Sequence, residues 1–477
     1  MKHHYNNLLK IIAIFLSFAV PFIFFSCDMG NTSITFGNNF KANVKLETEI
    51  INGKLGAVVY YDTVPEWLIV PQKVMNYDVI RIKMEDVSNI SDLGYITLPD
   101  SLLVIDTFKG AVKLASITLP ENLLVCPLFT GCILLDNITI PDKVSSIPST
   151  AFSLCSALKQ VNFGKSVQTI QSYAFNDCTA LESITFSQNL KTIENNAFEG
   201  CSALKELVMG NSISSIGSSA FLDCTAITTI SFSTALKKIS SYTFSGCKSL
   251  KETLSIPDNI TEIGEGAFEN CTKIETLKAG DNLTSIGSAA FSGCSLLKTI
   301  ELGKSLTKIE NYTFRDCTAI TDFTIPENIT ELGNGVFSGC TSLQSINHGE
   351  KIKTLGSSVF KDCKALTDFS VPENITEIAN EAFSGCTSLQ SIELGEKVKT
   401  MGSSVFKDCT VLATVTIHAT VPPTISETTF VITEDTSSTT TNTEQVTYEM
   451  TLKVPSAALN EYKEADYWKN FKTIEGI

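Results

Sequence analysis

Tryptophan and histidine are scarce in this sequence, whose 477 residues include two Trp and four His. Two of the histidines fall within the first 26 residues, so the rest of the chain holds only His348 and His418. Neither of them lies in a motif typical of a catalytic nucleophile. Gly-rich phosphate loops, paired catalytic carboxylates and Ser/His/Asp arrangements are also not recognisable. The sequence therefore does not indicate an enzyme.

Positive charge is in short supply. The chain has 36 Lys and Arg against 51 Asp and Glu, a formal net charge of −15. Without residues 1–26, which contribute two Lys and no acid, the charge is −17. A protein without a basic stripe lacks the main source of nucleic-acid affinity, and charge alone would not hold it on anionic lipid. Nucleic acid is therefore not an expected partner.

An apolar run from Ile11 to Phe25 follows basic residues and is short for a membrane span. This pattern predicts a secretory signal over residues 1–26. The run ends in Phe24-Phe25-Ser26-Cys27, which resembles the lipobox of bacterial lipoproteins. The resemblance implies a diacylglyceryl group on Cys27, which is the only membrane attachment expected. The protein would then be anchored in the bacterial envelope, at the outer membrane or cell surface. An ordinary cleaved signal and an uncleaved anchor are the alternatives, and the leaflet stays open.

Cysteine recurs with a fixed interval. Thirteen cysteines are 23 residues apart, with one interval of 24, and each follows a Phe by three residues. Mostly apolar residues follow each cysteine at positions plus three, six and eight. The chain is therefore built from tandem repeats. The cysteines are Cys132, Cys155, Cys178, Cys201, Cys224, Cys247, Cys271, Cys294, Cys317, Cys340, Cys363, Cys386 and Cys409.

Each repeat predicts two short strands. Ile184 and Phe186 alternate with polar residues as in a strand, and a second short segment follows from Leu190 to Ile193. A repeat of 23 residues is too small to close its own core, so repeats must stack and bury side chains against their neighbours. About 14 such turns are expected, and the extra residue near Thr253 predicts a bulge.

The unit Leu-x-x-Ile-x-Leu-Pro-x-x-Leu-x-x-Ile-x-x-x-Ala-Phe-x-x-Cys is closely matched by residues 135–155. This pattern resembles the BspA-type, or Treponema-type, leucine-rich repeat family. Phe108 and Ala111 keep the same frame, with Ala in place of Cys. The resemblance implies a β-rich leucine-rich-repeat solenoid with small caps. The expected segments are a signal over 1–26, a tether and N-terminal cap over 27–66, the solenoid over 67–417 and a C-terminal cap over 418–477.

The C-terminal cap is expected to begin with an exposed loop, because Thr433 to Thr443 is rich in Ser and Thr. Order should return after it, where aromatic and aliphatic residues recur up to Ile477. Trp468 and Phe471 are expected to cover the last turn, because the end of a stack must be capped.

Regular cysteines raise the question of disulfides and metal. Stacked turns would bring their Cα atoms within disulfide range. However, the side chains would all point the same way, their number is odd, and Ala111 occupies the same column. A column of small buried hydrophobic residues is the prediction, with pairing of some cysteines left open. Without a Cys-x-x-Cys pair or a nearby His, no metal and no cofactor are expected. Cys126 lies outside the column and is expected to be the most exposed thiol.

The sequence predicts only limited roles for the two histidines. Segments around Phe337 and Phe383 are nearly identical 46 residues apart, and His348 stands where the later copy has Leu394. His348 is therefore expected to be partly buried and hydrogen-bonded, with a pH-sensitive or ligating role as the alternative. His418 follows a strand at a turn. Duplication by pairs of repeats suggests that the chain extends a surface rather than building one unique pocket.

The outward residue of each first strand forms a second column, which is mostly small and polar. Such a face is long and shallow and suits extended proteins or glycans, although solubility alone also explains it. Neither aromatic nor Arg residues mark a hot spot on it. The candidate binding residues are Thr185, Ser231, Ser255, Lys278, Glu301, Thr324, Asn347, Ser370 and Glu393.

The family resemblance implies a non-enzymatic, adhesin-like binding protein of the cell surface. Extracellular matrix proteins or other surface proteins, and also glycans, are the partners that it implies. A structural scaffold of the envelope without a host ligand is the alternative. An enzyme would need a site in the segment before the repeats or in the tail, and neither segment carries a recognisable one.

Overall fold

The structure is a computed structural model of the chain. It describes residues 27–36, 40–84, 87, 89–349, 351–431 and 447–477, with side chains from Glu47 onward. The expected signal and the Ser/Thr-rich run of the tail lie outside the described residues. The chain divides into two compact units, residues 1–167 and 168–477. Both are made largely of β-solenoid turns, about 17 in all, so the predicted fold class is confirmed.

The first unit begins with a sheet of longer strands. β1 pairs with β2 and β2 with β3 in antiparallel fashion, whereas β3 and β6 are parallel. Residues 27–66, expected to form a tether and N-terminal cap, contribute three strands to this sheet. The strands of this sheet are β1 (Cys27–Phe36), β2 (Phe40–Ile51), β3 (Lys54–Tyr61), β5 (Lys73–Val74), β6 (Tyr77–Lys83) and β8 (Val104–Ile105).

The solenoid turns of the first unit start within this sheet, because β6 is also a parallel neighbour of β8. Phe108 and Ala111 are fully buried, and the Phe108 ring stacks on Phe129 with centroids 5.2 Å apart. The frame predicted for these two residues is therefore confirmed in a turn without the cysteine. The remaining elements of this unit are β4 (Trp67–Ile69), the 3-10 helix η1 (Ile90–Asp92), β7 (Tyr95–Thr97), β9 (Asn137–Thr139), β10 (Ser146–Ile147) and β11 (Gln160–Asn162).

A charged cluster joins the sheet to the first turns. The Arg81 guanidinium lies 3.2 Å from a Glu49 carboxylate oxygen and 2.8 Å from Asp106 Oδ1, and both carboxylates are almost buried. The neighbouring carboxylates raise the pKa of Arg81 against the opposing effect of desolvation. Removing one member of such a cluster leaves the others as uncompensated buried charge.

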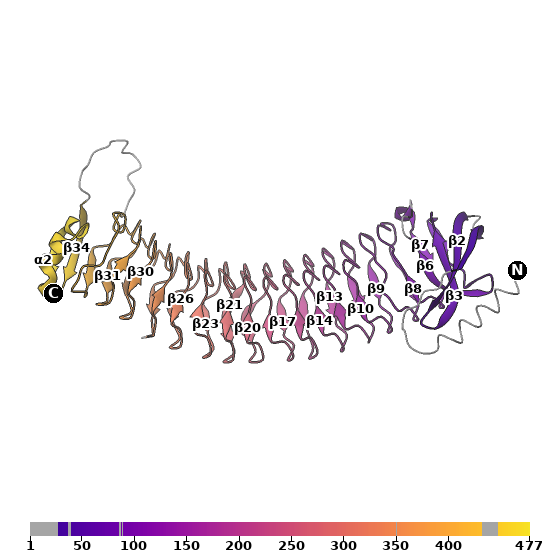
Figure 1. The fold of residues 1–477 in the computed structure, drawn as a ribbon, viewed down its shortest axis with the longest axis horizontal. Coiled ribbons are helices and arrows are strands. Elements are labelled where there is room, and N and C mark those ends of the chain that lie inside the picture. Colours follow the sequence, from indigo (N-terminus) through magenta and orange to yellow (C-terminus); the bar gives the residue numbers. More distant parts are fainter. Residues whose placement is uncertain (1–26, 37–39, 85–86, 88, 350, 432–446) are drawn as a thin grey trace, which may run out of the picture. The chain divides into compact units, whose positions relative to one another are not determined.

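The second unit repeats one turn with two strands (Figure 1). Strands in successive turns are parallel neighbours in register, as in Glu206↔Thr229 and Thr192↔Ser215. The longer strands are β13 (Ser183–Thr185), β15 (Glu206–Val208), β17 (Thr229–Ser231), β19 (Glu252–Ile256), β21 (Ile274–Ala279), β23 (Thr299–Glu301), β25 (Asp322–Thr324), β27 (Ser345–Asn347), β29 (Asp368–Ser370), β31 (Ser391–Leu394) and β33 (Thr414–Ile417).

The shorter strands form the second face of these turns. Each has one buried and one exposed or half-exposed residue, as the apolar spacing predicts. They are β12 (Thr169–Ile170), β14 (Thr192–Ile193), β16 (Ser215–Ile216), β18 (Lys238–Ile239), β20 (Glu262–Ile263), β22 (Ser285–Ile286), β24 (Lys308–Ile309), β26 (Glu331–Leu332), β28 (Thr354–Leu355), β30 (Glu377–Ile378) and β32 (Thr400–Met401).

Two columns of side chains fill the core of the second unit. Phenylalanine rings stack turn on turn from Phe175 to Phe430, with centroids 5.0 to 6.0 Å apart. Beside them lie the side chains of the described cysteines of the column, which are buried. Thiols of this column, such as those of Cys294 and Cys340, donate to the carbonyl of the Phe one turn earlier, and Cys317 Sγ lies 3.2 Å from Phe291 O. The predicted column of small buried residues is confirmed.

Burial sets the chemistry of these thiols. It raises the pKa of Cys294 and Cys409 to about 12, and that of Cys224 well above its ordinary value. The expectation for Cys126 is wrong, because its side chain is only 2% exposed. Although Cys126 lies outside the column, it faces the same interior, and its pKa is likewise raised by desolvation.

The residue before each cysteine has a left-handed backbone, with φ between 55° and 77° in the second unit. From Asp177 to Asp408 this position alternates strictly between Gly and Asp or Asn. A Cβ atom on Gly246 would overlap the Asp223 carboxylate of the preceding turn, and the same holds for Gly385 and Asp362. Glycine therefore supplies both the backbone conformation and the space for the neighbouring acidic side chain.

The predicted bulge is confirmed, because the register of β19 and β21 shifts between Glu252 and Thr253.

The C-terminal end of the second unit is closed by aromatic residues, as expected. Trp468 and Phe471 pack edge-on against Phe430 at 5.4 and 5.0 Å. The elements of the tail are β34 (Tyr448–Val454), η2 (Ser456–Ala458), α2 (Leu459–Glu464), η3 (Trp468–Asn470) and β35 (Phe471–Gly476).

Candidate binding face

The outward column of the longer strands is the candidate binding face. All nine predicted residues are exposed on these strands. Where adjacent strands form a ladder, the column is in register, as in Ser255↔Lys278, Lys278↔Glu301 and Ser370↔Glu393. The inward neighbours of these residues fill the core, so the column itself contributes little to packing. The positions of the nine residues are Thr185, Ser231, Ser255, Lys278, Glu301, Thr324, Asn347, Ser370 and Glu393.

Several members of the column interact with each other across turns. The Lys278 ammonium lies 3.3 Å from Glu301, and His418 Nε2 lies 2.7 Å from Glu393 Oε1. His418 thus joins the end of the column, a role that its position after β33 did not reveal. His348 is half-buried and its ring lies 6.1 Å from that of Phe369, in agreement with the expected partial burial.

A groove interrupts the face between two turns. β15 begins a sheet with β17, and no strand ladder joins it to β13 among the described strands. The cavity at this gap has a volume of about 960 Å³. Ile184 and Met209 are buried at its floor, and Phe186 is half-buried. The face is therefore hollowed between β13 and β15.

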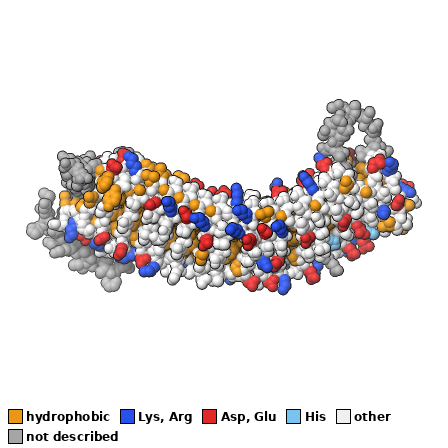
Figure 2. All heavy atoms as spheres, turned by 180° about the vertical axis from the view of Figure 1, so that it is seen from behind, with side chains coloured by type: hydrophobic (Ala, Val, Ile, Leu, Met, Phe, Trp, Pro, Cys, Tyr) orange, Lys and Arg blue, Asp and Glu red, His pale blue; other side chains and the backbone are white. Residues whose placement is uncertain are grey.

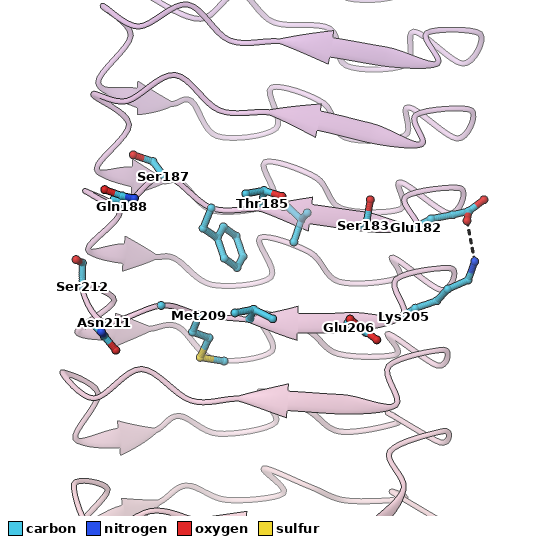
Figure 3. A pocket seen from close by; sticks show the side chains of 14 residues that line it. Glu182, Ser183, Thr185, Ser187, Gln188, Lys205, Glu206, Met209, Asn211 and Ser212 are labelled. Atoms are coloured by element: carbon cyan, nitrogen blue, oxygen red, sulfur yellow. Dashed lines mark hydrogen bonds and ion pairs between the residues drawn. The ribbon is translucent and has the colours of Figure 1, made fainter.

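Polar residues lie at both ends of this groove (Figure 3). At one end the Lys205 ammonium and the Glu182 carboxylate form an ion pair of 2.7 Å. Gln188, Asn211 and Ser212 lie at the other end. Between them Val208 is 60% exposed. The sequence did not predict the groove, because the strand pattern of this repeat is the same as elsewhere. The apolar Val208 in a mostly polar column is the one signal that could have indicated it.

The charges on the surface are mixed in sign. On the side shown in Figure 2, basic and acidic side chains lie interspersed over the second unit. Many of them pair between adjacent turns, such as Lys298 with Glu275 at 3.4 Å and Lys308 with Glu331 at 2.8 Å. Exposed pairs of this kind are each worth about 1 kcal/mol or less. They align turns without creating a strong field of one sign.

The described part of the chain holds no group of three or more His, Cys, Asp or Glu side chains that could bind a metal ion. None of its helices is long and apolar enough to cross a membrane. The cysteine side chains described from Glu47 onward are buried in the core, so none of them lies on the candidate binding face.

Two aromatic side chains are exposed on strands of the first unit. Trp67 is 61% exposed on β4 and Tyr95 is 47% exposed on β7, and their rings are 5.5 Å apart. The expected lack of an aromatic hot spot concerned the outward column over residues 118–416, and these two aromatic residues precede that range. The sequence did not indicate this aromatic pair, because the repeat frame is unclear around β4 and β7.

A family model described as a BspA type leucine rich repeat region matches residues 126–251, 251–367 and 356–452, with six copies of the repeat. No curated protein matches the chain. A leucine-rich repeat protein from Bacteroides ovatus has a similar structure, with 23% identity and a TM-score of 0.57, over 80% of this chain and 95% of that chain.

Two further solved structures are less similar. A leucine rich cell surface protein from Faecalibacterium prausnitzii is 20% identical with a TM-score of 0.43, over 81% of this chain and 95% of that chain. A leucine-rich repeat protein from Eubacterium ventriosum is 18% identical with a TM-score of 0.42, over 88% of this chain and 98% of that chain. The likeness to the Bacteroides ovatus protein concerns the fold alone.

Proposed function

Because the chain belongs to the BspA-type leucine-rich repeat family, we propose that it is a non-enzymatic binding protein of the bacterial cell surface. Solenoids commonly bind partners along one face of the stack. The single observation that carries the proposal is the outward column, whose residues are exposed and in register, yet are not needed for the core. Proteins of the extracellular matrix or of other cells, or glycans, are the proposed partners.

Attachment to the envelope is the second part of the proposal. Cys27 follows the expected signal and is the proposed lipidation site. Two acyl chains anchor a protein stably where a single chain does not. The net charge of −17 that remains after loss of the signal supports attachment by lipid rather than by attraction to anionic headgroups. The cell surface or outer membrane is the proposed location.

Two substitutions on the column test the binding function. Ser231→Arg with Ser370→Arg places bulky charge at two exposed column positions, without touching the core. We expect binding to immobilised matrix proteins, measured by surface plasmon resonance, to fall about tenfold or more if these positions lie in the interface. The matched control is Ser285→Arg with Thr354→Arg on the shorter strands, at positions that are equally exposed.

The outcomes separate the rival functions. Equal loss in both double variants, or loss in neither despite measurable binding, would contradict binding through this face. Treatment of intact cells with an external protease adds a second criterion. Protection of the protein from the protease would favour an internal scaffold of the envelope over a surface binding protein.

A further inference from the structure

The first unit carries an aromatic pair on the same strand face. Trp67 on β4 is the register neighbour of Tyr95 on β7, and the two rings are tilted by 42° at 5.5 Å. The residues between the outward positions, Leu68 and Ile96, are buried and hold the strands in the core. The rings are therefore presented to solvent by a rigid backbone and are not required for packing.

A polar cleft adjoins this pair. It has a volume of about 800 Å³, and Tyr95 forms part of its lining. Hydroxyl, amide and carboxylate groups supply most of the remaining polar surface, from Thr97, Asp100, Ser116, Thr118, Glu121, Asn122 and Asn137. The Asn122 amide is fixed by its donation to the Asp100 carbonyl at 3.0 Å and by acceptance from Lys143 at 2.7 Å. The cleft thus has one rigid wall.

The lining also carries net negative charge. It includes Asp100 and Glu121, both exposed, and neither Lys nor Arg among the described residues, while the Lys143 ammonium at the border is hydrogen-bonded to Asn122. Anionic ligands such as phosphorylated or sulfated groups would meet two carboxylates against this one ammonium, and the balance is repulsive. A neutral ligand rich in hydroxyl groups, in contrast, can both donate to these carboxylates and accept from the amides and hydroxyls.

Exposed aromatic rings beside such groups match the two sides of a sugar. A pyranose ring has an apolar C–H face, which suits the negative face of an aromatic ring, and a rim of hydroxyl groups. A hot spot for a protein partner would instead place the aromatic residues inside a ring of contacts that exclude water. The rings here lie at the border of a polar, open cleft.

We propose that Trp67 and Tyr95, with the cleft lined by Thr97, Asp100, Thr118 and Glu121, form a binding site for a neutral oligosaccharide. This inference rests on the proposed binding function and assigns a ligand class to one part of the face. The ring pair stacks against sugar rings, while the carboxylates and hydroxyls bind the sugar hydroxyl groups. The site lies wholly within the first unit.

Tryptophan fluorescence provides a direct measurement. The sequence has only two tryptophans, and Trp468 is 1% exposed while Trp67 is 61% exposed. The chain from residue 27 onward is titrated with cellohexaose, xylohexaose, maltohexaose and mannohexaose, and with oligogalacturonate as the acidic comparison. We expect a blue shift of Trp67 emission with at least one neutral sugar, and weaker or no binding of the acidic one.

Variants identify the residues responsible. By calorimetry, Trp67→Ala and Tyr95→Ala should each weaken sugar binding by about tenfold or more, as is typical for truncation of a central aromatic contact. Tyr95→Phe, which keeps the ring, should retain most of the affinity. Tyr173→Ala is the matched control, since Tyr173 is similarly exposed at 44% in the second unit. Thermal melting of all variants should stay unchanged, because the side chains are exposed.

The result that would contradict the oligosaccharide site differs from the result that would contradict binding of protein partners through the outward column. If none of the neutral hexaoses binds, or if binding is unaffected by Trp67→Ala, the oligosaccharide site is wrong. Loss of a protein partner in Trp67→Ala without any sugar binding would show a protein hot spot instead. Ser231→Arg with Ser370→Arg, in the other unit, should leave sugar binding intact even if it abolishes binding of matrix proteins.

Discussion

At the scale of single residues, cysteine has a purely structural role in the repeat. The side chain is small enough for the space beside the stacked Phe rings, and its thiol donates to a carbonyl of the preceding turn. That carbonyl also accepts the backbone N–H of the cysteine in its own turn, as Phe291 O accepts from Cys294. Ala111, which is buried at the same position, shows that a small side chain without this hydrogen bond is accommodated there.

This role predicts that the thiols are inert in the folded chain. With Cys27→Ser in the chain from residue 27 onward, 14 cysteines remain, all of them buried. Burial raises the pKa of Cys155 to about 12, so below that pH the thiol stays protonated and unreactive. We expect mass spectrometry to find no iodoacetamide adduct at pH 8 in the native protein and 14 in denaturant.

A positive control accompanies that measurement. Ser231→Cys places a thiol at an exposed position of the outward column and should react once in the native state. Native labelling of Cys126 would contradict the interior position that the structure gives to this residue. Labelling of a column cysteine such as Cys317 faster than global unfolding would contradict the packing of the core.

At the scale of the repeat element, much was predictable from the sequence. The period of Phe and Cys fixed which residues face inward, and the extra residue between Cys247 and Cys271 indicated the bulge at Glu252. Local spacing is sufficient here because each turn contacts mainly its nearest neighbours.

Other features of the elements were not predictable in this way. The gap between β13 and β15 lies between two turns that share the strand pattern of the others, so alternation along the strands does not mark it. The sheet from β1 to β3 lacks a repeat, so its strands in the segment before Trp67 had no periodic signal. For the binding face, the column positions followed from alternation along the strand, whereas Trp67 lies in a turn where the repeat frame is weak.

Alternation of Gly and Asp before the cysteine predicts a coupling between neighbouring turns. Gly246→Ala should destabilise the protein by more than about 1–2 kcal/mol, the range for a left-handed L-residue, because the new Cβ also overlaps Asp223. Gly210→Ala is the matched control, since Gly210 has φ 66° and open space around the added atom. Gly210→Ala should destabilise the protein only through the left-handed backbone conformation, without a steric overlap.

The double variant isolates the contact itself. In the Asp223→Gly background, Gly246→Ala should be less destabilising by about 0.5 kcal/mol or more, since the overlapping carboxylate is absent. Thermal melting followed by circular dichroism gives the comparison. Equal effects of Gly246→Ala in the two backgrounds would show that the two turns are not coupled through this contact.

At the scale of the whole molecule, the ends decide whether the stack is soluble and where it is held. Tyr462 and Trp468 close one end, donating to the carbonyls of Ala419 and Pro423 at 2.9 and 2.7 Å. Strand β1 begins at Cys27, the proposed lipidation site. A lipid there would join the membrane directly to the N-terminal sheet.

The anchor can be tested in bacterial cells. We expect the full chain to incorporate an alkyne-tagged fatty acid and to partition into the detergent phase of a Triton X-114 extract. Cys27→Ser should lose both properties, whereas Cys126→Ser, a substitution of a buried cysteine, should keep them. Tagging that persists in Cys27→Ser would contradict lipidation at this residue.

The alternation before the cysteines also bears on how such a chain can change its length over generations. Loss or gain of one coil would set two acidic side chains, or two glycines, against each other at the new junction. Loss or gain of two coils would leave every junction as it was. Descendants and relatives that share this alternation should therefore differ in size by even numbers of coils, with the 46-residue duplication around Phe337 and Phe383 as one such event.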